Sequence, residues 1–201
     1  GSVFVGKAAG AATTSGAKNV AVGRSALATN IDGDFNTAVG HEALTTFEAD
    51  TDGHGKNTAV GYQAGTSVST GTGNTIVGAG SGDALAGGDD NVFMGVDAGG
   101  ATTAGSAIVA IGSGAAAAVM TADAAGTTAV GYQAGAAITS GIGNTAIGSN
   151  ALDAEDDGDQ NTAIGYSCLS AQTGVTGVVG STAVGYNAGL ALTTGVRNVI
   201  I

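Results

Sequence analysis

The sequence predicts an all-β protein: a parallel β-solenoid, or β-roll, of about twelve 17-residue coils that assembles as a homotrimer. Three observations predict this fold. The chain has 38 Gly in 201 residues and neither Pro nor Trp, unlike an ordinary globular domain. A five-residue motif recurs at a nearly constant interval. Within the motif, β-branched residues alternate with small ones, as expected for a short strand.

The motif is Asn-Thr-Ala-Val-Gly and its variants, and we number its positions 1 to 5. The Gly at position 5, the closing Gly, occurs at Gly6, Gly23, Gly40, Gly61, Gly78, Gly95, Gly112, Gly131, Gly148, Gly165 and Gly185. The interval is 17 residues, with insertions of 4, 2 and 3 residues in three coils. A twelfth copy begins at Asn198. We therefore expect a single solenoid array over residues 1–201 that is cut within a repeat at both ends.

The strand positions predict which side chains share a face. Position 2 is Val or Thr and position 4 is Val, Ile or Met in all twelve copies. Their bulk and β-branching favour a buried surface, so we expect positions 2 and 4 to line the core of the solenoid. Position 3 then points outward, yet it is Ala in eight copies and Phe or Ile in the others. An apolar outer face predicts a cover, which neighbouring copies in a homotrimer would supply about a shared axis.

The remaining positions predict the turns of each coil. Position 1 is Asn in eight of twelve copies, which suits a corner in left-handed backbone and a ladder of stacked amides. A small stretch after the closing Gly, such as Tyr62-Gln63-Ala64-Gly65, predicts a second short strand, and a Gly three residues before many motifs predicts a tight turn. Residues 115–118 are all Ala and favour helix, but the period continues through them, so we expect an irregular coil with a two-residue insertion.

Charge and hydropathy exclude some partners. Sixteen acidic against five basic residues give a net charge of −11, which repels a polyanion, so we expect no nucleic-acid partner. Apolar runs are interrupted every few residues, so we expect no membrane insertion by this segment. The single Cys168 cannot form an intrachain disulfide and is expected to be a small apolar filler.

The stretch Asn57-Thr58-Ala59-Val60-Gly61-Tyr62-Gln63-Ala64-Gly65 resembles two related families. One is the repeat array of phage tail fibres, and the other is the head domain of trimeric autotransporter adhesins. The resemblance covers essentially the whole chain and implies a left-handed parallel β-roll wound as a homotrimer. It implies an extracellular structural or adhesive role: the shaft of a virion tail fibre involved in host attachment, or alternatively the head or stalk of a bacterial surface adhesin. A host surface glycan or protein receptor would then be a partner.

The sequence predicts no enzyme and no cofactor. His41 and His54 have no Ser-His-Asp, Cys-His or His-rich pattern around them, and most carboxylates lie on turns. A tailspike-type glycan depolymerase is the remote enzymatic alternative. Paired carboxylates in a groove between chains would favour it.

Acidic turns offer oxygen atoms around a Gly, which calcium prefers, although none has the full ligand pattern of a calcium-binding loop. Solvated turns are the favoured interpretation, and calcium is the alternative. The candidate ligands are Asp50, Asp52, Asp156, Asp157 and Asp159.

All four tyrosines directly follow a closing Gly, and they form a candidate surface-binding stripe: Tyr62, Tyr132, Tyr166 and Tyr186. Their rings could stack on sugars, but packing or plain surface is the favoured interpretation. An ice-binding solenoid, with a flat array of Thr, is a further alternative. The position 2 Thr residues are expected to be buried, which argues against it.

Overall fold

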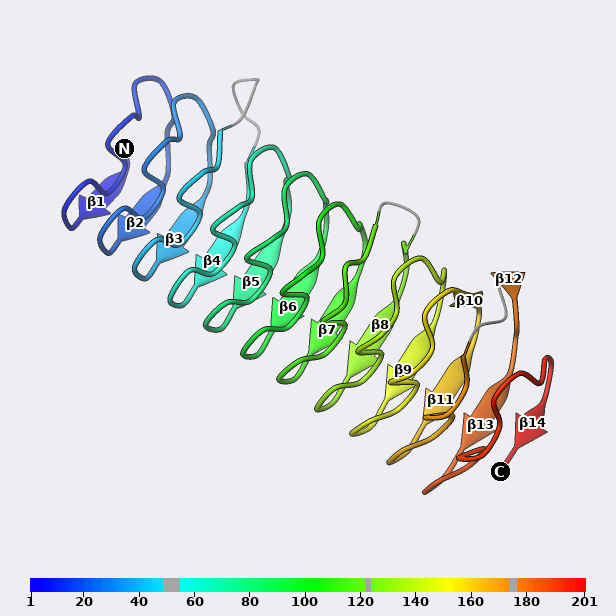
Figure 1. Cartoon of the computed structure of the whole chain (residues 1–201). Coiled ribbons are helices and arrows are strands. Elements are labelled where there is room, and N and C mark those ends of the chain that lie inside the picture. Colours follow the sequence, from blue (N-terminus) through cyan, green and yellow to red (C-terminus); the bar gives the residue numbers. More distant parts are fainter. Residues whose placement is uncertain (49–54, 122–123, 174–176) are drawn as a thin grey trace.

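The structure is a computed structural model, and it describes residues 1–48, 55–121, 124–173 and 177–201. The chain winds into a rod of stacked coils, with its two termini at opposite ends (Figure 1). Strands are the only regular elements of the described residues, which contain no helix. The predicted all-β parallel solenoid is confirmed.

One twelve-stranded parallel sheet runs along the rod (Figure 1). Each strand pairs with its equivalent in the next coil, so that Thr58 lies beside Thr75 and Val60 beside Val77. The sheet therefore repeats the motif in register. Its strands, in sheet order, are β1 (Val3–Val5), β2 (Val20–Val22), β3 (Thr37–Val39), β4 (Thr58–Val60), β5 (Thr75–Val77), β6 (Val92–Met94), β7 (Val109–Ile111), β8 (Thr128–Val130), β9 (Thr145–Ile147), β11 (Thr162–Ile164), β13 (Thr182–Val184) and β14 (Val199–Ile200).

The predicted second strand after each closing Gly is wrong. That stretch forms turns because the second and fourth residues after the closing Gly take left-handed backbone, as at Gln63 (φ 54°) and Gly65 (φ 59°). Extended backbone is incompatible with these angles. Two further short strands, β10 (Gly158–Asp159) and β12 (Gly177–Val178), pair in parallel as a separate sheet elsewhere in the coils.

The core lies on the opposite strand face from the one predicted. In β2 to β9, β11 and β13, the position 3 residue is fully buried, whereas positions 2 and 4 are half-buried or exposed. A second column of small residues, the third after each closing Gly, belongs to the same core cluster and includes Ala64, Ala134 and Cys168. These two columns, mostly of small side chains, share the interior of the coil with larger side chains such as Leu44, Phe47 and Leu85. The larger Val, Ile and Met side chains of position 4 remain outside.

The position 1 Asn side chains form the predicted ladder. Asn57 Oδ1 accepts hydrogen bonds from the backbone N–H of Asn74 (2.9 Å) and from its Nδ2 (3.1 Å). Asn74 Nδ2 also donates to the Gly88 carbonyl at 2.8 Å, which ties the ladder to the return segment. The predicted left-handed corner lies one residue earlier, as at Lys56 (φ 60°). The amides are fully buried and therefore connect coils from within.

Close contact between coils explains two Gly columns. A Cβ on the closing Gly61, whose φ is +146°, would lie 2.4 Å from the Gly78 carbonyl oxygen. A Cβ on Gly71, three residues before the next motif, would lie 2.4 Å from the Gly88 oxygen, although Gly71 has no positive φ. Gly is therefore required at this position by the close approach of the neighbouring coil's backbone, and not by the tight turn that the sequence predicted. The Ala stretch at residues 115–118 begins with turns, consistent with the predicted irregular coil.

Candidate functional site

The most extensive unusual surface is an apolar strip on the outside of the main sheet. We call it the apolar face, and it consists of motif positions 2 and 4 of the twelve strands. Position 4 contributes Val, Ile or Met in every copy, and position 2 contributes Val or Thr. No charged side chain interrupts either column. The apolar face therefore runs along the whole sheet.

The side chains of this strip are accessible in the single chain. Val60, Ile147 and Ile164 are 37%, 38% and 37% exposed, although each lies in an interior strand of the sheet. Twelve strands about 4.8 Å apart extend over about 55 Å, and a width of about 10 Å gives on the order of 500 Å². That is near the upper end for the largest apolar patch on a soluble monomer. A surface of this kind commonly contacts another molecule.

The tyrosine stripe lies beside the closing Gly column and is exposed. Tyr166 and Tyr186 are 52% and 76% exposed, and their rings stack with centroids 5.3 Å apart and an interplanar angle of 12°. Tyr62 and Tyr132 are also more than half exposed. Register between coils thus brings Tyr166 and Tyr186 together across a three-residue insertion. Tyr62 instead stacks on His41, with a centroid distance of 5.4 Å.

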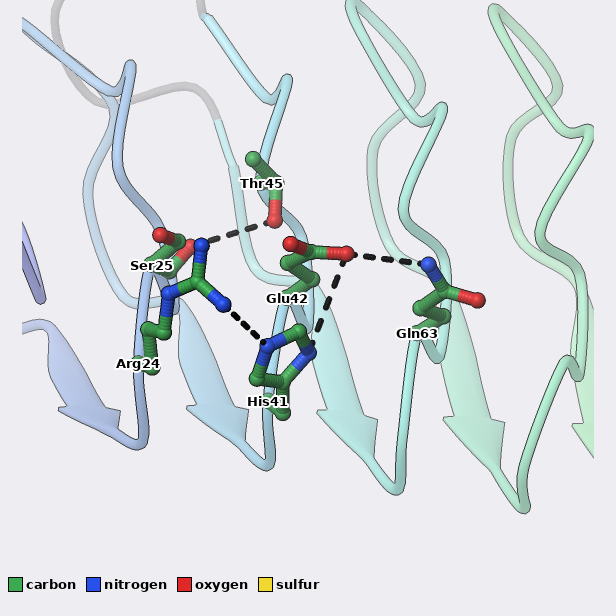
Figure 2. A network of polar contacts seen from close by, with 6 residues as sticks. All are labelled: Arg24, Ser25, His41, Glu42, Thr45 and Gln63. Carbon is green, nitrogen blue, oxygen red and sulfur yellow. Dashed lines mark hydrogen bonds and ion pairs between the residues drawn. The ribbon is translucent and has the colours of Figure 1, made fainter.

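A polar network extends this stack across three coils (Figure 2). Arg24 Nη1 donates to His41 Nε2 at 3.2 Å, and His41 Nδ1 lies 3.7 Å from Glu42 Oε2. Gln63 Nε2 donates to the same Glu42 oxygen at 2.9 Å. These contacts place His41 between a cation, a carboxylate and an aromatic ring. The arrangement links neighbouring coils at the surface. The other histidine, His54, lies outside the described residues.

The predicted calcium ligands do not all come together. Asp50 and Asp52 lie outside the described residues. Asp159 Oδ1 accepts the Ile142 backbone N–H at 2.8 Å, so it caps the preceding coil. Asp156 and Asp157 group with Glu155, and one carboxylate oxygen from each of the three lies within 4.8 Å of the others.

Glu155 is the residue that sequence reasoning missed. It is fully buried, and it is the seventh residue after a closing Gly, Gly148. The same position is apolar in some coils, as at Val68, Leu85 and Ile138, and polar but uncharged in others, as at Asn30, Thr102 and Gln172. Glu155 is the one charged residue among the eleven residues of this column, and this was the signal that could have identified it.

Cys168 occupies the second core column, where most coils have Ala. Its Sγ lies 3.2 Å from the Ala183 carbonyl oxygen as a hydrogen-bond donor. Burial raises the pKa of the thiol, partly opposed by a backbone hydrogen bond. A buried thiol with a raised pKa is a poor nucleophile, so Cys168 fits the predicted role of a filler.

Comparison with protein-family models gives no match, and comparisons with curated proteins and with solved structures give none either. In the part of the chain that the structure describes, no helix is long and apolar enough to cross a membrane.

Proposed function

We propose that this chain is a shaft segment of an extracellular fibre and that it assembles as a homotrimer through the apolar face. The observation that carries the proposal is the continuous, uncharged strip of positions 2 and 4 on a rod of stacked coils. The fibre is a phage tail fibre involved in host attachment, with the head or stalk of a bacterial trimeric surface adhesin as the alternative. Both rest on the motif resemblance.

Self-association explains the composition of the strip. Three copies with their strips turned toward a common axis would bury positions 2 and 4 along the full length of the sheet. Burying this area removes apolar surface from water, at about 25 cal/mol per Å². The trimer axis therefore passes next to positions 2 and 4, and not next to position 3 as the sequence predicted, because position 3 fills the solenoid core.

A rod of this type suits a spacer. Each strand pairs only with its neighbours in the sheet, so length grows with the number of coils without a change in cross-section. Such a shaft would hold a receptor-binding tip at a distance from its particle or cell. The exposed tyrosine stripe lies on the same rod and could add weak adhesion to glycans along its length.

The oligomeric state of the purified chain tests the proposal. Light scattering coupled to size exclusion should give the mass of three chains. The double variant Val60→Glu, Ile147→Glu places charges on the apolar face and should give a monomer with an unchanged far-ultraviolet spectrum. The control is Ile31→Glu, Leu190→Glu, which adds the same charge at exposed apolar positions outside the strip and should remain trimeric.

Two outcomes would contradict the proposal. One is a folded, monomeric parent protein over the concentrations of the assay. The other is a trimer that both double variants retain, since the interface would then lie elsewhere.

One observation supports a second candidate, an ice-binding surface. Seven of the twelve position 2 residues are Thr, and the structure places this column on the exposed apolar face instead of in the core. The argument from burial against an ice-binding solenoid therefore fails. A monomeric parent that depresses the freezing point without changing the melting point, and loses this activity in the Val60→Glu, Ile147→Glu variant, would favour this function over the fibre.

A further inference from the structure

Glu155 is a buried acid in a position where every other coil has an apolar or an uncharged polar side chain. The seventh residue after the closing Gly is buried at Val68, Leu85 and Ile138, and these side chains belong to the hydrophobic core. Glu155 takes this position after Gly148 and is fully buried. Hydrophobic packing cannot explain a carboxylate there.

Only part of the Glu155 carboxylate is satisfied by the protein. Oε1 accepts the backbone N–H of Gly158 at 2.9 Å. Oε2 is buried and has no hydrogen-bond partner among the described residues. An ionised oxygen removed from water without a partner is costly, so among the described residues one strong acceptor is left that a bound cation could satisfy.

The neighbouring acids make this position more negative. Asp156 and Asp157 follow Glu155 directly, and the three residues can each contribute an oxygen to a group whose members lie within 4.8 Å of one another. Two oxygens on opposite sides of one calcium ion, each about 2.4 Å away, are at most about 4.8 Å apart. One ion can therefore contact all three carboxylates.

The donor atoms favour calcium over other metals. The group contains carboxylates and neither His nor Cys, so its ligands are hard oxygens. Calcium accepts carboxylates at variable angles and completes its shell with water, whereas magnesium requires near-octahedral geometry. Three ligands from consecutive residues of one turn fit the more permissive ion better.

We propose that Glu155, Asp156 and Asp157 bind one calcium ion, with Glu155 as the ligand from the core side. The ion would neutralise three adjacent carboxylates and satisfy the buried oxygen of Glu155. It would also fix the turn that leads into β10, where Gly158 pairs with Gly177 of the following coil. Calcium would therefore stabilise the stacking of these two coils.

Calorimetric titration and thermal melting of the intact chain test the site. After treatment with a chelator, the protein should bind one calcium ion per chain with a dissociation constant of about 1 mM or tighter, and calcium should raise its melting temperature. Magnesium should bind at least about tenfold more weakly. Glu155→Gln keeps the size of the side chain, removes its charge and should weaken calcium binding by about tenfold or more.

Two further variants make the result specific. Glu155→Leu introduces the side chain that Leu85 has in the same column; it should melt higher than the calcium-free parent and show no response to calcium. Asp90→Asn removes an exposed carboxylate from another coil and should bind calcium like the parent.

Three results would overturn the proposal. The first is the absence of any calcium effect on the parent protein. The second is calcium binding that Glu155→Gln and Asp90→Asn retain equally, which would indicate diffuse binding to the acidic surface. The third is equal affinity for magnesium, which would contradict the choice of calcium. None of these results depends on the oligomeric state, so the site and the proposed fibre function can fail separately.

Discussion

At the scale of single residues, contacts one coil away explain much of the polar sequence. Asp34 Oδ1 accepts the Ala17 N–H at 2.6 Å, and Asp89 Oδ1 accepts the Thr72 N–H at 2.7 Å. Both acids directly follow the Gly that precedes the motif by three residues, as Asp159 does. Their carboxylates satisfy backbone donors in turns that have no ladder partner. Many acids in the return segment are therefore structural, and Glu155 differs because its carboxylate lies in the core.

Asp83 gives a prediction on pH dependence at this scale. Burial raises the pKa of Asp83 above its usual 3.8, and the nearby Asp97 carboxylate raises it further. The folded protein thus binds the Asp83 proton more tightly than the unfolded chain does, so this contribution to stability is present below about pH 4 and is lost as the pH rises through the raised pKa. Near pH 7, the ionised Asp83 destabilises the fold.

We expect Asp83→Asn to melt about 1–2 °C higher than the parent near pH 7, a small effect because the side chain is only half-buried. The difference should disappear near pH 3. Melting curves across this range check the prediction, with Asp90→Asn as a control for the loss of one exposed charge. A variant that is less stable than the parent at neutral pH would contradict it.

At the scale of the elements, Asn74 offers a test of the amide ladder. Its Nδ2 donates to Gly88 O and Asn57 Oδ1, and its Oδ1 accepts from Asn91 N. Asn74→Ala leaves buried polar groups unpaired and should destabilise the protein by about 3 kcal/mol. Asn74→Ser should cost less, because Ser2 Oγ accepts the equivalent Asn19 N–H at 3.0 Å.

Urea denaturation at a fixed protein concentration measures both ladder variants. Equal stability of Asn74→Ala and the parent would show that the ladder contributes little. Ile108 at the same position 1 shows that one apolar residue is compatible with the fold, since Asn91 Oδ1 still accepts the Ile108 N–H at 2.9 Å.

The elements also show which structural features a sequence can predict. The period, the strand column and the Asn ladder follow from counting residues, and the structure confirms them. Alternation states only that Val60 and Ala59 point to opposite sides; it does not state which side is the core. Both columns are apolar, so hydrophobicity alone could not identify which face is the core. A turn forms where the second strand was predicted, because residues such as Gln63 and Asn150 take left-handed backbone. Asn adopts this backbone only occasionally and Gln rarely does, so the residue types alone did not predict the turn. Glu155 was identifiable only once the core columns were known.

At the scale of the whole molecule, stability is distributed along one dimension. Each coil contacts its neighbours through the same strand, ladder and core columns, so the rod has no single centre on which it depends. The apolar face has the same property, because every coil adds one residue of position 2 and one of position 4. Coils can therefore be added or removed without changing the interface that we propose, provided that the register is kept.

Deletion of one entire coil tests this modular architecture. Removing residues 132–148 joins Gly131 to Ser149 and brings β8 beside β11, with Ala129 against Ala163 where Ala146 now lies. Position 1 then places Thr127 beside Asn161, and its hydroxyl can accept the Asn161 N–H as Ser2 Oγ accepts that of Asn19. We expect a folded protein with an unchanged far-ultraviolet circular dichroism spectrum per residue and a modestly lower melting temperature.

The control removes residues 132–147 and retains Gly148 as one extra residue, which shifts every later column by one position relative to Gly131. This 16-residue deletion should unfold the junction and lower the melting temperature much further. Circular dichroism and thermal melting compare the two deletions, and equal stability of both would show that the columns do not hold the coils in register.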